Sequence, residues 1–128
     1  MGWRPAPDAD YSFHSFPVVH EMAKDFISGL AGAGGIERGN PESFLGIYSQ
    51  NRVEWLVGAL GCWMMSNAIV PLYDTLGPAA SSFIINQAKT ALVIVDTAKK
   101  VKSRIYPVIL FWRNRATCFR HCSLLFIK

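Results

Sequence analysis

The chain has 128 residues, of which 51% are hydrophobic and 17% are charged. This length suits one domain, and the apolar content excludes an intrinsically disordered protein. The net charge of +4 is distributed unevenly along the chain. Residues 1–98 hold five Lys or Arg against nine Asp or Glu, whereas residues 99–128 hold eight Lys or Arg and no acidic residue. Three cysteines are too few for a disulfide framework, so a reducing compartment is the default expectation.

The first predicted helix covers residues 16–30 and follows an extended lead-in. Its apolar residues recur at three- and four-residue spacing, which indicates one buried face: Val19, Met22, Ala23, Phe26, Ile27 and Leu30. Residues 29–35 then read GLAGAGG, which offers a phosphate cradle or a helix end. A dinucleotide-binding loop follows a strand and opens a helix, whereas this stretch closes a helix, so the sequence favours a helix end.

A strand, a helix and a second strand are predicted over residues 44–72. Residues 44–49 have strand character, and Asn51 predicts an Asx-type start for the next helix, with Glu54 in its first turn. That helix, over residues 53–65, is apolar on almost all sides. Residues 68–72 are short and β-branched, which predicts a buried strand.

A turn over residues 74–77 leads to a third helix, which begins at Pro78 and reaches about Lys89. We expect one side of this helix to be buried: Ala80, Phe83, Ile84 and Ala88. Residues 91–95 form another continuous apolar strand. Apolar strands that alternate with helices predict an α/β fold, a partial Rossmann-like sheet of three parallel strands with helices on both faces, followed by an irregular C-terminal tail.

Three strands leave part of this fold uncovered. One edge of the sheet and part of the apolar helix would face water, which predicts aggregation or dependence on a protein partner that covers the exposed sheet.

A run of 19 residues without charge, from Trp55 to Tyr73, raises the question of a membrane span. Ser66 and Asn67 interrupt the run where a helix would end, and the β-branched segment after them suits a strand. A buried helix followed by a buried strand therefore explains the run better than a transmembrane helix.

Residues 46–78 carry the most specific pattern in the chain. They contain a strand that ends in G-I-x-x-Q-N-R, then x-E-W, an apolar helix and V-P-L-Y-D-T-L-G. This pattern resembles the N-terminal part of long-chain acyl-CoA synthetases, which belong to the AMP-forming adenylating superfamily. The matching residues are Gly46, Ile47, Gln50, Asn51, Arg52, Glu54, Trp55, Val70, Pro71, Leu72, Tyr73, Asp74, Thr75, Leu76 and Gly77. Weaker similarity extends the resemblance to about residues 2–101.

The resemblance implies a long-chain fatty-acid–CoA ligase, which converts fatty acid, ATP and CoA to acyl-CoA, AMP and pyrophosphate. It implies ATP, Mg and CoA as cofactors of a full-length enzyme and the surface of the endoplasmic reticulum or another organelle as its location. The family's phosphate loop ending in Pro-Lys-Gly and its Tyr-Gly-x-Thr-Glu adenine motif are absent from this sequence. We therefore assign no catalytic, cofactor-binding or metal residue and expect a chain that is inactive alone.

Two polar groups follow predicted strands, where ligands gather in open α/β sheets. For Asp74 and Thr75 the favoured interpretation is a turn and helix start in which both side chains accept backbone N–H bonds. For Gln50, Asn51 and Arg52 it is a polar turn, with Arg52 paired to an acid or to carbonyl groups.

Histidine and cysteine residues offer two incomplete constellations. Cys118, His121 and Cys122 supply three of the four ligands of a structural zinc site, and a fourth would have to come from His14 or His20. His14, His20 and Glu21 make no triad, because no nucleophile is suitably spaced. The sequence favours neither site.

The tail, residues 102–128, forms a segment of its own after the partial synthetase domain of residues 1–101. It interleaves cations with aromatic residues, as single-strand nucleic-acid binders and interfacial membrane segments do: Phe111, Trp112, Arg113, Arg115, Phe119 and Arg120. The composition changes abruptly where the tail begins. A novel C-terminus without a function of its own, produced by alternative splicing, intron read-through or a frameshifted gene model, is an alternative explanation of this change.

Three functions are consistent with these features. The first is a truncated long-chain fatty-acid–CoA ligase, inactive as this chain alone. The second is a non-catalytic interaction module that binds another polypeptide through the half-sheet. The third is a membrane or nucleic-acid adaptor that works through the basic tail.

Overall fold

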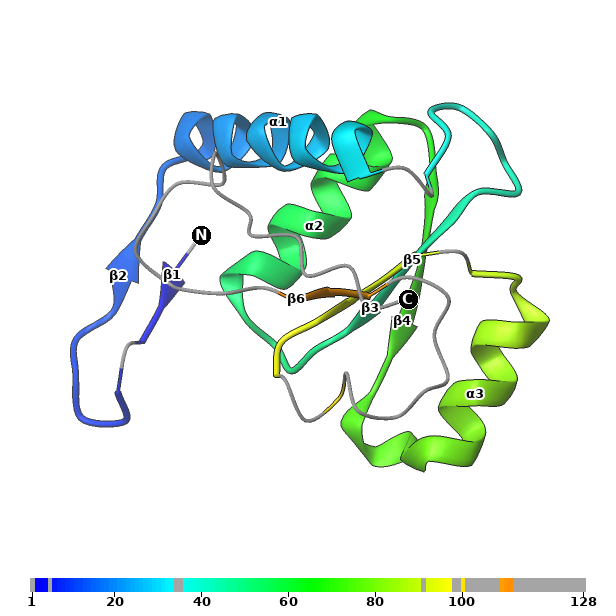
Figure 1. Cartoon of the computed structure of the whole chain (residues 1–128). Coiled ribbons are helices and arrows are strands. Elements are labelled where there is room, and N and C mark those ends of the chain that lie inside the picture. Colours follow the sequence, from blue (N-terminus) through cyan, green and yellow to red (C-terminus); the bar gives the residue numbers. More distant parts are fainter. Residues whose placement is uncertain are drawn as a thin grey trace.

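The structure, a computed structural model, describes residues 2–4, 6–33, 36–90, 92–97, 100 and 109–111 (Figure 1). A small antiparallel sheet pairs β1 (Gly2–Trp3) with β2 (Ser12–Phe13), so the predicted lead-in contains a hairpin. The main sheet is parallel throughout and has the strand order β4-β3-β5-β6.

The three predicted parallel strands are confirmed, and a fourth joins them. They are β3 (Phe44–Tyr48), β4 (Ala68–Leu72) and β5 (Leu92–Val95). The fourth strand, β6 (Ile109–Phe111), pairs with β5 and lies in the segment that the sequence analysis treats as an irregular tail. Apart from β6, the tail lies outside the described residues.

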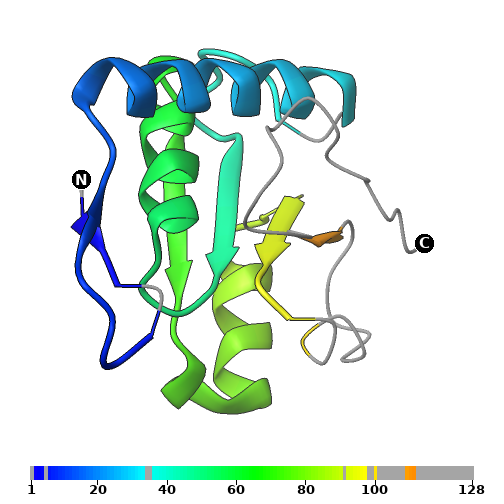
Figure 2. The ribbon, with the colours of Figure 1, turned by 90° about the vertical axis from the view of Figure 1, so that its left-hand side faces the viewer.

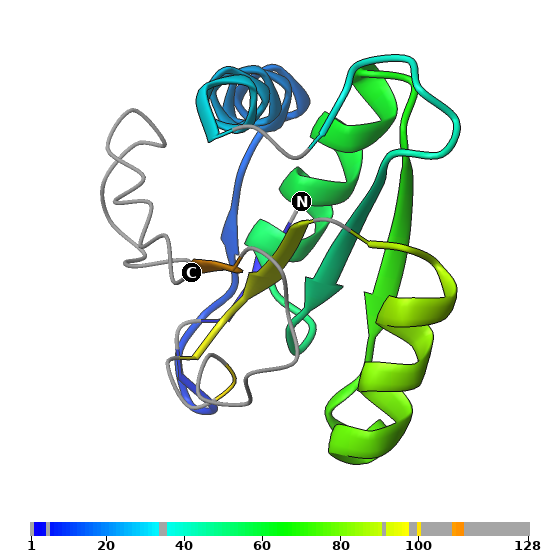
Figure 3. The ribbon, with the colours of Figure 1, turned by 45° about the vertical axis from the view of Figure 1, so that its right-hand side comes forward.

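Helices cover both faces of the main sheet, as predicted. On one face, α2 (Val53–Met64) packs on the strands and α1 (Phe16–Ala33) crosses α2, whereas α3 (Gly77–Gln87) lies on the opposite face (Figures 2 and 3). The short 3-10 helix η1 (Asp74–Leu76) precedes α3. Helix α1 continues through Gly29 to Ala33, beyond its predicted end at Leu30.

The core between α1, α2 and the sheet confirms the buried face that the sequence predicts for the first helix. Val19, Ala23, Phe26 and Leu30 are buried there together with Leu45, Ile47, Leu92 and Ile94 from the strands. The two helices approach closely at Gly61, where a Cβ atom would lie 2.8 Å from Phe26 Cδ1 and 3.2 Å from the carbonyl oxygen of Ala23. A larger residue at position 61 would push α1 away from α2.

The core under α3 is smaller, and its helical side differs from the prediction. Leu72, Val93 and Val95 from the strands meet Ile85 of α3. Ser81 is also fully buried, because its hydroxyl donates to the Gly77 carbonyl oxygen at 2.9 Å. The expectation that Phe83 is buried is wrong, since it is 67% exposed and lies on the outer side of the helix.

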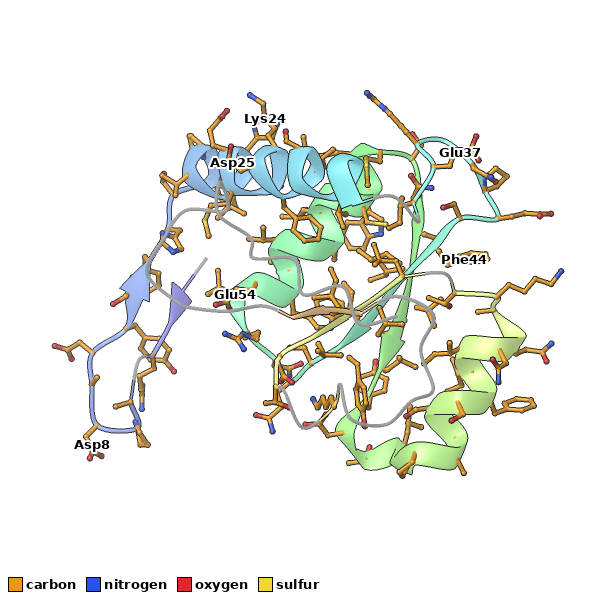
Figure 4. The ribbon with its side chains drawn as sticks, viewed as in Figure 1. Asp8, Lys24, Asp25, Glu37, Phe44 and Glu54 are labelled. Atoms are coloured by element: carbon orange, nitrogen blue, oxygen red, sulfur yellow. The ribbon has the colours of Figure 1, made fainter. Side chains whose placement is uncertain are left out.

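Ser66 and Asn67 end α2, as predicted. Ser66 adopts a left-handed backbone with φ of 61°. Asn67 is buried, and its side-chain nitrogen lies 2.8 to 3.1 Å from the carbonyl oxygens of Glu37, Asn40 and Ser43. Asn67 thereby ties the loop before β3, in which Figure 4 labels Glu37, to the start of β4.

Candidate functional site

The carboxyl ends of β3 and β5 lie side by side and form the place where a ligand site is expected. From β3 the chain continues to β4, on the side of β3 away from β5, and from β5 it continues to β6, on the side of β5 away from β3. In open α/β sheets, ligands bind at such a switch point, outside the carboxyl ends of the strands. Residues 49–52, which follow β3, meet Asp96 and Lys100, which follow β5, at this end of the sheet.

Arg52 and Glu54 form a bidentate salt bridge at the start of α2. Glu54 is labelled in Figure 4. Arg52 Nε donates to Glu54 Oε2 at 2.8 Å and Nη2 donates to Oε1 at 2.9 Å. The hydrogen bond to Glu54 outweighs burial and raises the pKa of the Arg52 guanidinium. The prediction that Arg52 pairs with an acid is confirmed.

The predicted Asx-type start at Asn51 is wrong. Arg52, with extended backbone, occupies the N-cap of α2, and no side chain among the described residues hydrogen bonds to cap this helix. Glu54 lies in the first turn as expected. The helix start therefore relies on the favourable position of the Glu54 charge and on the Arg52 pair.

Lys100 connects three elements at this end of the sheet. Its ammonium contacts a carboxylate oxygen of Asp74 and lies 2.8 Å from Asp96 Oδ1. It also donates to the Tyr48 carbonyl oxygen at 3.4 Å and lies 4.4 Å from the centre of the Tyr48 ring. Lys100 thus links the ends of β3 and β5 to η1.

The predicted capping role of Asp74 is replaced by this contact. Asp74 begins η1, and no side-chain hydrogen bond from the described residues caps either η1 or α3. Thr75 is exposed. Pro78 stands in the first turn of α3, as predicted.

Both partners in the Lys100 network have shifted pKa values. Burial raises the pKa of the Asp96 carboxyl, but hydrogen bonds from Lys100 and from the Gln50 N–H outweigh burial, so its pKa lies below the ordinary 3.8. Burial lowers the pKa of the Lys100 ammonium, but the hydrogen bonds to Asp74 and Asp96 hold it above the ordinary 10.5. Both groups are therefore charged at neutral pH.

A shallow hollow opens between the two loops, where the Gln50 N–H donates to Asp96 Oδ2 at 3.1 Å. Its empty volume is about 200 Å³, open solvent included. The lining residues are Ile47, Ser49, Arg52, Glu54, Trp55, Ile94, Val95 and Asp96.

The charged side chains around the hollow form ion pairs with one another. Arg52 is paired with Glu54, and Lys100 is held by two carboxylates. In this structure each of the two cations is engaged by carboxylates. These ion pairs hold the chain segments at this end of the sheet together.

Lys100 and Asp96 were absent from the candidate residues of the sequence analysis. Asp96 follows β5 just as Gln50 follows β3, so the rule about strand ends could have identified it. Lys100 stands four residues after Asp96, a spacing that suits an ion pair. Its contact with Asp74 depends on the tertiary fold.

The other candidate groups do not join this region. Glu21 lies on the exposed side of α1, 3.0 Å from Lys24 Nζ and 3.7 Å from His20 Nδ1. The hydrogen bond from Lys24 lowers the pKa of Glu21. Burial raises the pKa of the Cys62 thiol to about 11, so this thiol is protonated at neutral pH.

The proposed metal and nucleic-acid residues of the tail cannot be placed. Cys118, His121 and Cys122 lie outside the described residues, as do the arginines at positions 113, 115 and 120. Among the residues that the structure does describe, no three His, Cys, Asp or Glu side chains gather as metal ligands would. The described helices also include none with the length and apolarity that a membrane crossing requires.

Comparison with curated proteins gives long-chain-fatty-acid–CoA ligases among the relatives of this chain. The chain is 42% identical over 99 residues to the human long-chain-fatty-acid–CoA ligase 1 and 40% identical over 100 residues to the mouse long-chain-fatty-acid–CoA ligase 6. These alignments cover 75% and 78% of this chain but 14% of each relative. The chain therefore spans about one seventh of the length of these ligases.

Solved structures share the fold. The acyl-CoA synthetase of Brucella canis superposes with a TM-score of 0.75 over 94% of this chain and 22% of its own, at 18% identity. Residues 3–115 match the AMP-binding enzyme family, a match that continues past residue 101 and includes β6. With most of its length matched and its fold shared, the chain belongs to the family of AMP-binding enzymes.

Proposed function

We propose that this chain provides the opening α/β units of the N-terminal domain of a long-chain fatty-acid–CoA ligase and does not catalyse the ligase reaction alone. The observation that carries the proposal is the 42% identity to a human ligase over 99 residues that make up 14% of that enzyme. Identity at this level supports a common fold and origin, while the coverage leaves most of the ligase outside the matched region.

The motifs missing from the sequence support the expectation that the chain does not catalyse the reaction alone. The ligase reaction develops negative charge on phosphate oxygens, which requires preorganised donors. Removal of a single such donor typically costs about a hundred- to a thousandfold in rate, so a chain without the Pro-Lys-Gly loop and the adenine motif loses the reaction.

The substrates and cofactors belong, in this proposal, to the complete enzyme. Fatty acid, CoA, ATP and Mg would bind to parts of a ligase that lie beyond the residues of this chain. We assign no catalytic residue, cofactor-binding residue or metal ligand within residues 1–128.

The test is an assay of acyl-CoA formation from palmitate, ATP and CoA, with the purified chain and with the full-length human ligase as the positive control. We expect the chain to give no product above the buffer background. Product that requires ATP, CoA and the chain together would overturn the inactive half of the proposal.

A second function, that of an interaction module, is favoured by one observation. Large apolar side chains of α2 and α3 and of the residue after β4 are exposed: Trp63, Met64, Phe83 and Tyr73. Exposed apolar surface that forms a contiguous patch is typical of a protein interface.

A further inference from the structure

The loop before β3, residues 37–43, directs three main-chain carbonyl oxygens at one atom. The side-chain nitrogen of Asn67 lies 2.8 Å from the carbonyl oxygen of Glu37, 3.1 Å from that of Asn40 and 3.1 Å from that of Ser43. We call these three oxygens the carbonyl cage. Asn67 reaches the cage from the turn between α2 and β4, and the residue is only 4% exposed. The cage is therefore a site lined by oxygen atoms, with a buried amide as its occupant.

The loop keeps its shape through hydrogen bonds of its own. The Glu37 N–H donates to Ser43 Oγ at 2.9 Å, which joins the two ends of the loop. The Asn40 side chain donates from Nδ2 to Glu37 Oε2 at 2.8 Å and accepts from the Glu42 N–H at 2.9 Å. Because none of these bonds involves Asn67, we expect the carbonyl cage to persist when its occupant is changed.

An amide satisfies the carbonyl cage incompletely. Asn67 Nδ2 carries two N–H groups, whereas three carbonyl oxygens accept from it. The Oδ1 atom of the same side chain is buried and has no hydrogen-bond donor among the described residues. Burial of an unpaired oxygen costs stability, so the fold gains from the nitrogen end of this side chain alone.

The chemistry of the carbonyl cage suits a small cation. Backbone carbonyl oxygens that converge on one point can replace the water shell of a monovalent cation, as they do in the filters of potassium channels. An ammonium ion has enough N–H groups for all three oxygens, and the distances in the cage lie within the usual N–H···O range of about 2.7 to 3.2 Å. In the same loop Glu37 and Glu42 outnumber Arg38, and this excess of negative charge favours a cation.

We propose that the carbonyl cage is a site for a monovalent cation of the size of ammonium and that Asn67 takes the place of this cation within the chain. The side-chain nitrogen lies where the cation would bind. Asn67 thereby makes the link between the loop and β4 independent of dissolved salts. Removal of the side chain vacates the site, and the same link then depends on a bound ion.

The experiment measures thermal unfolding of the full 128-residue chain by circular dichroism, in ammonium chloride and in choline chloride at neutral pH and equal ionic strength. Choline has no N–H group to donate to the carbonyl oxygens. Wild type should have the same melting temperature in both salts. Asn67→Ala should melt below wild type in choline chloride and about 5 to 10 °C higher in ammonium chloride, as expected for an ion present at about ten times its dissociation constant.

Two further variants test whether the effect comes from the carbonyl cage. Asn67→Leu fills a similar space without a donor, so it should be less stable than wild type and should melt at the same temperature in both salts. Asn67→Asp places carboxylate oxygens against the cage, so its rise in ammonium chloride should exceed that of Asn67→Ala. If Asn67→Ala is unfolded in choline chloride, addition of ammonium should restore its helical circular dichroism.

Two results would contradict the proposal. The first is an Asn67→Ala variant whose melting temperature is equal in the two salts, or which stays unfolded when ammonium is added. The second is an equal rise in wild type or in Asn67→Leu, which would assign the effect to the solution and not to the carbonyl cage. A rise confined to Asn67→Ala and Asn67→Asp would support the site.

Discussion

The two faces of the main sheet are stabilised in different ways. Under α1 and α2, twelve described residues form one buried apolar cluster, whereas the described cluster under α3 contains four. On the α3 face, ionic contacts supplement the smaller apolar cluster. Lys100 contacts Asp74, which precedes α3, and its ammonium lies over the ring of Tyr48. The Tyr48 side chain in turn packs against the cluster.

This difference predicts different responses to solution conditions. Apolar packing depends little on pH, since no proton is bound or released. A network of two carboxylates and an ammonium depends on pH through the shifted pKa values of Asp96 and Lys100. Substitutions on each face should therefore differ in size and in pH dependence.

Leu45→Ala should have the largest effect. Leu45 is fully buried in the central strand β3 and belongs to the larger core, so the cavity cannot collapse easily. We expect a loss of about 3 to 5 kcal/mol in the free energy of unfolding, measured by urea denaturation at neutral pH. A loss below about 2 kcal/mol would show that this face is packed less tightly than described.

Leu72→Ala is the matched change on the other face. Leu72 is 1% exposed in the outer strand β4 and faces the smaller cluster with Ile85. Because fewer neighbours surround the cavity, the expected loss is about 2 to 3 kcal/mol in the same measurement. A larger loss than that of Leu45→Ala would reverse the comparison of the two faces.

Lys100→Met should have the smallest effect and the clearest pH signature. It removes the ammonium while keeping an apolar stem, and it leaves Asp96, whose side chain is 7% exposed, without its partner. We expect a loss of about 1 to 2 kcal/mol in the free energy of unfolding at neutral pH, below the figure for fully buried pairs because Asp74 is 37% exposed.

The sign of the pH dependence follows from the two pKa shifts. The pKa of Asp96 is lowered in the folded state, so its contribution is present above pH 3.8 and is lost as the pH falls through the folded pKa. The pKa of Lys100 is raised, so its contribution is present below pH 10.5 and is lost as the pH rises through the folded pKa. The difference between wild type and Lys100→Met should therefore shrink at both extremes, and a constant difference would contradict the network.

The sequence predicted the elements on the α1 side well because their patterns are strong. The apolar residues of α1 keep a helical period, and four of the six predicted core positions are buried while Met22 and Ile27 pack against the core. The three predicted strands, β3, β4 and β5, are continuous apolar runs, which suits a sheet covered on both faces.

The α3 side was predicted less well, for two physical reasons. Helix α3 mixes small and apolar residues without a clear stripe, and the burial of Ser81 depends on a hydrogen bond to Gly77 that hydrophobicity does not reveal. Lys100 pairs with Asp96, four positions earlier in the sequence, and with Asp74, 26 positions earlier. The pair with Asp74 forms only when the sheet is folded. Strand β6 was missed because the apolar run of residues 105–112 was interpreted as part of an interfacial or accidental tail, although a run of this length also suits a buried strand.

The close contact between α1 and α2 at Gly61 also means that α1 can dock only after α2 has been synthesised. Helix α1 leaves the ribosome first, but its docking surface includes Gly61 of α2 and the strands that follow. At about 5 to 20 residues per second, α2 is completed roughly two to six seconds after α1. During that interval the apolar face of α1 lacks the helix that covers it in the folded chain, so this face is exposed until α2 has been made.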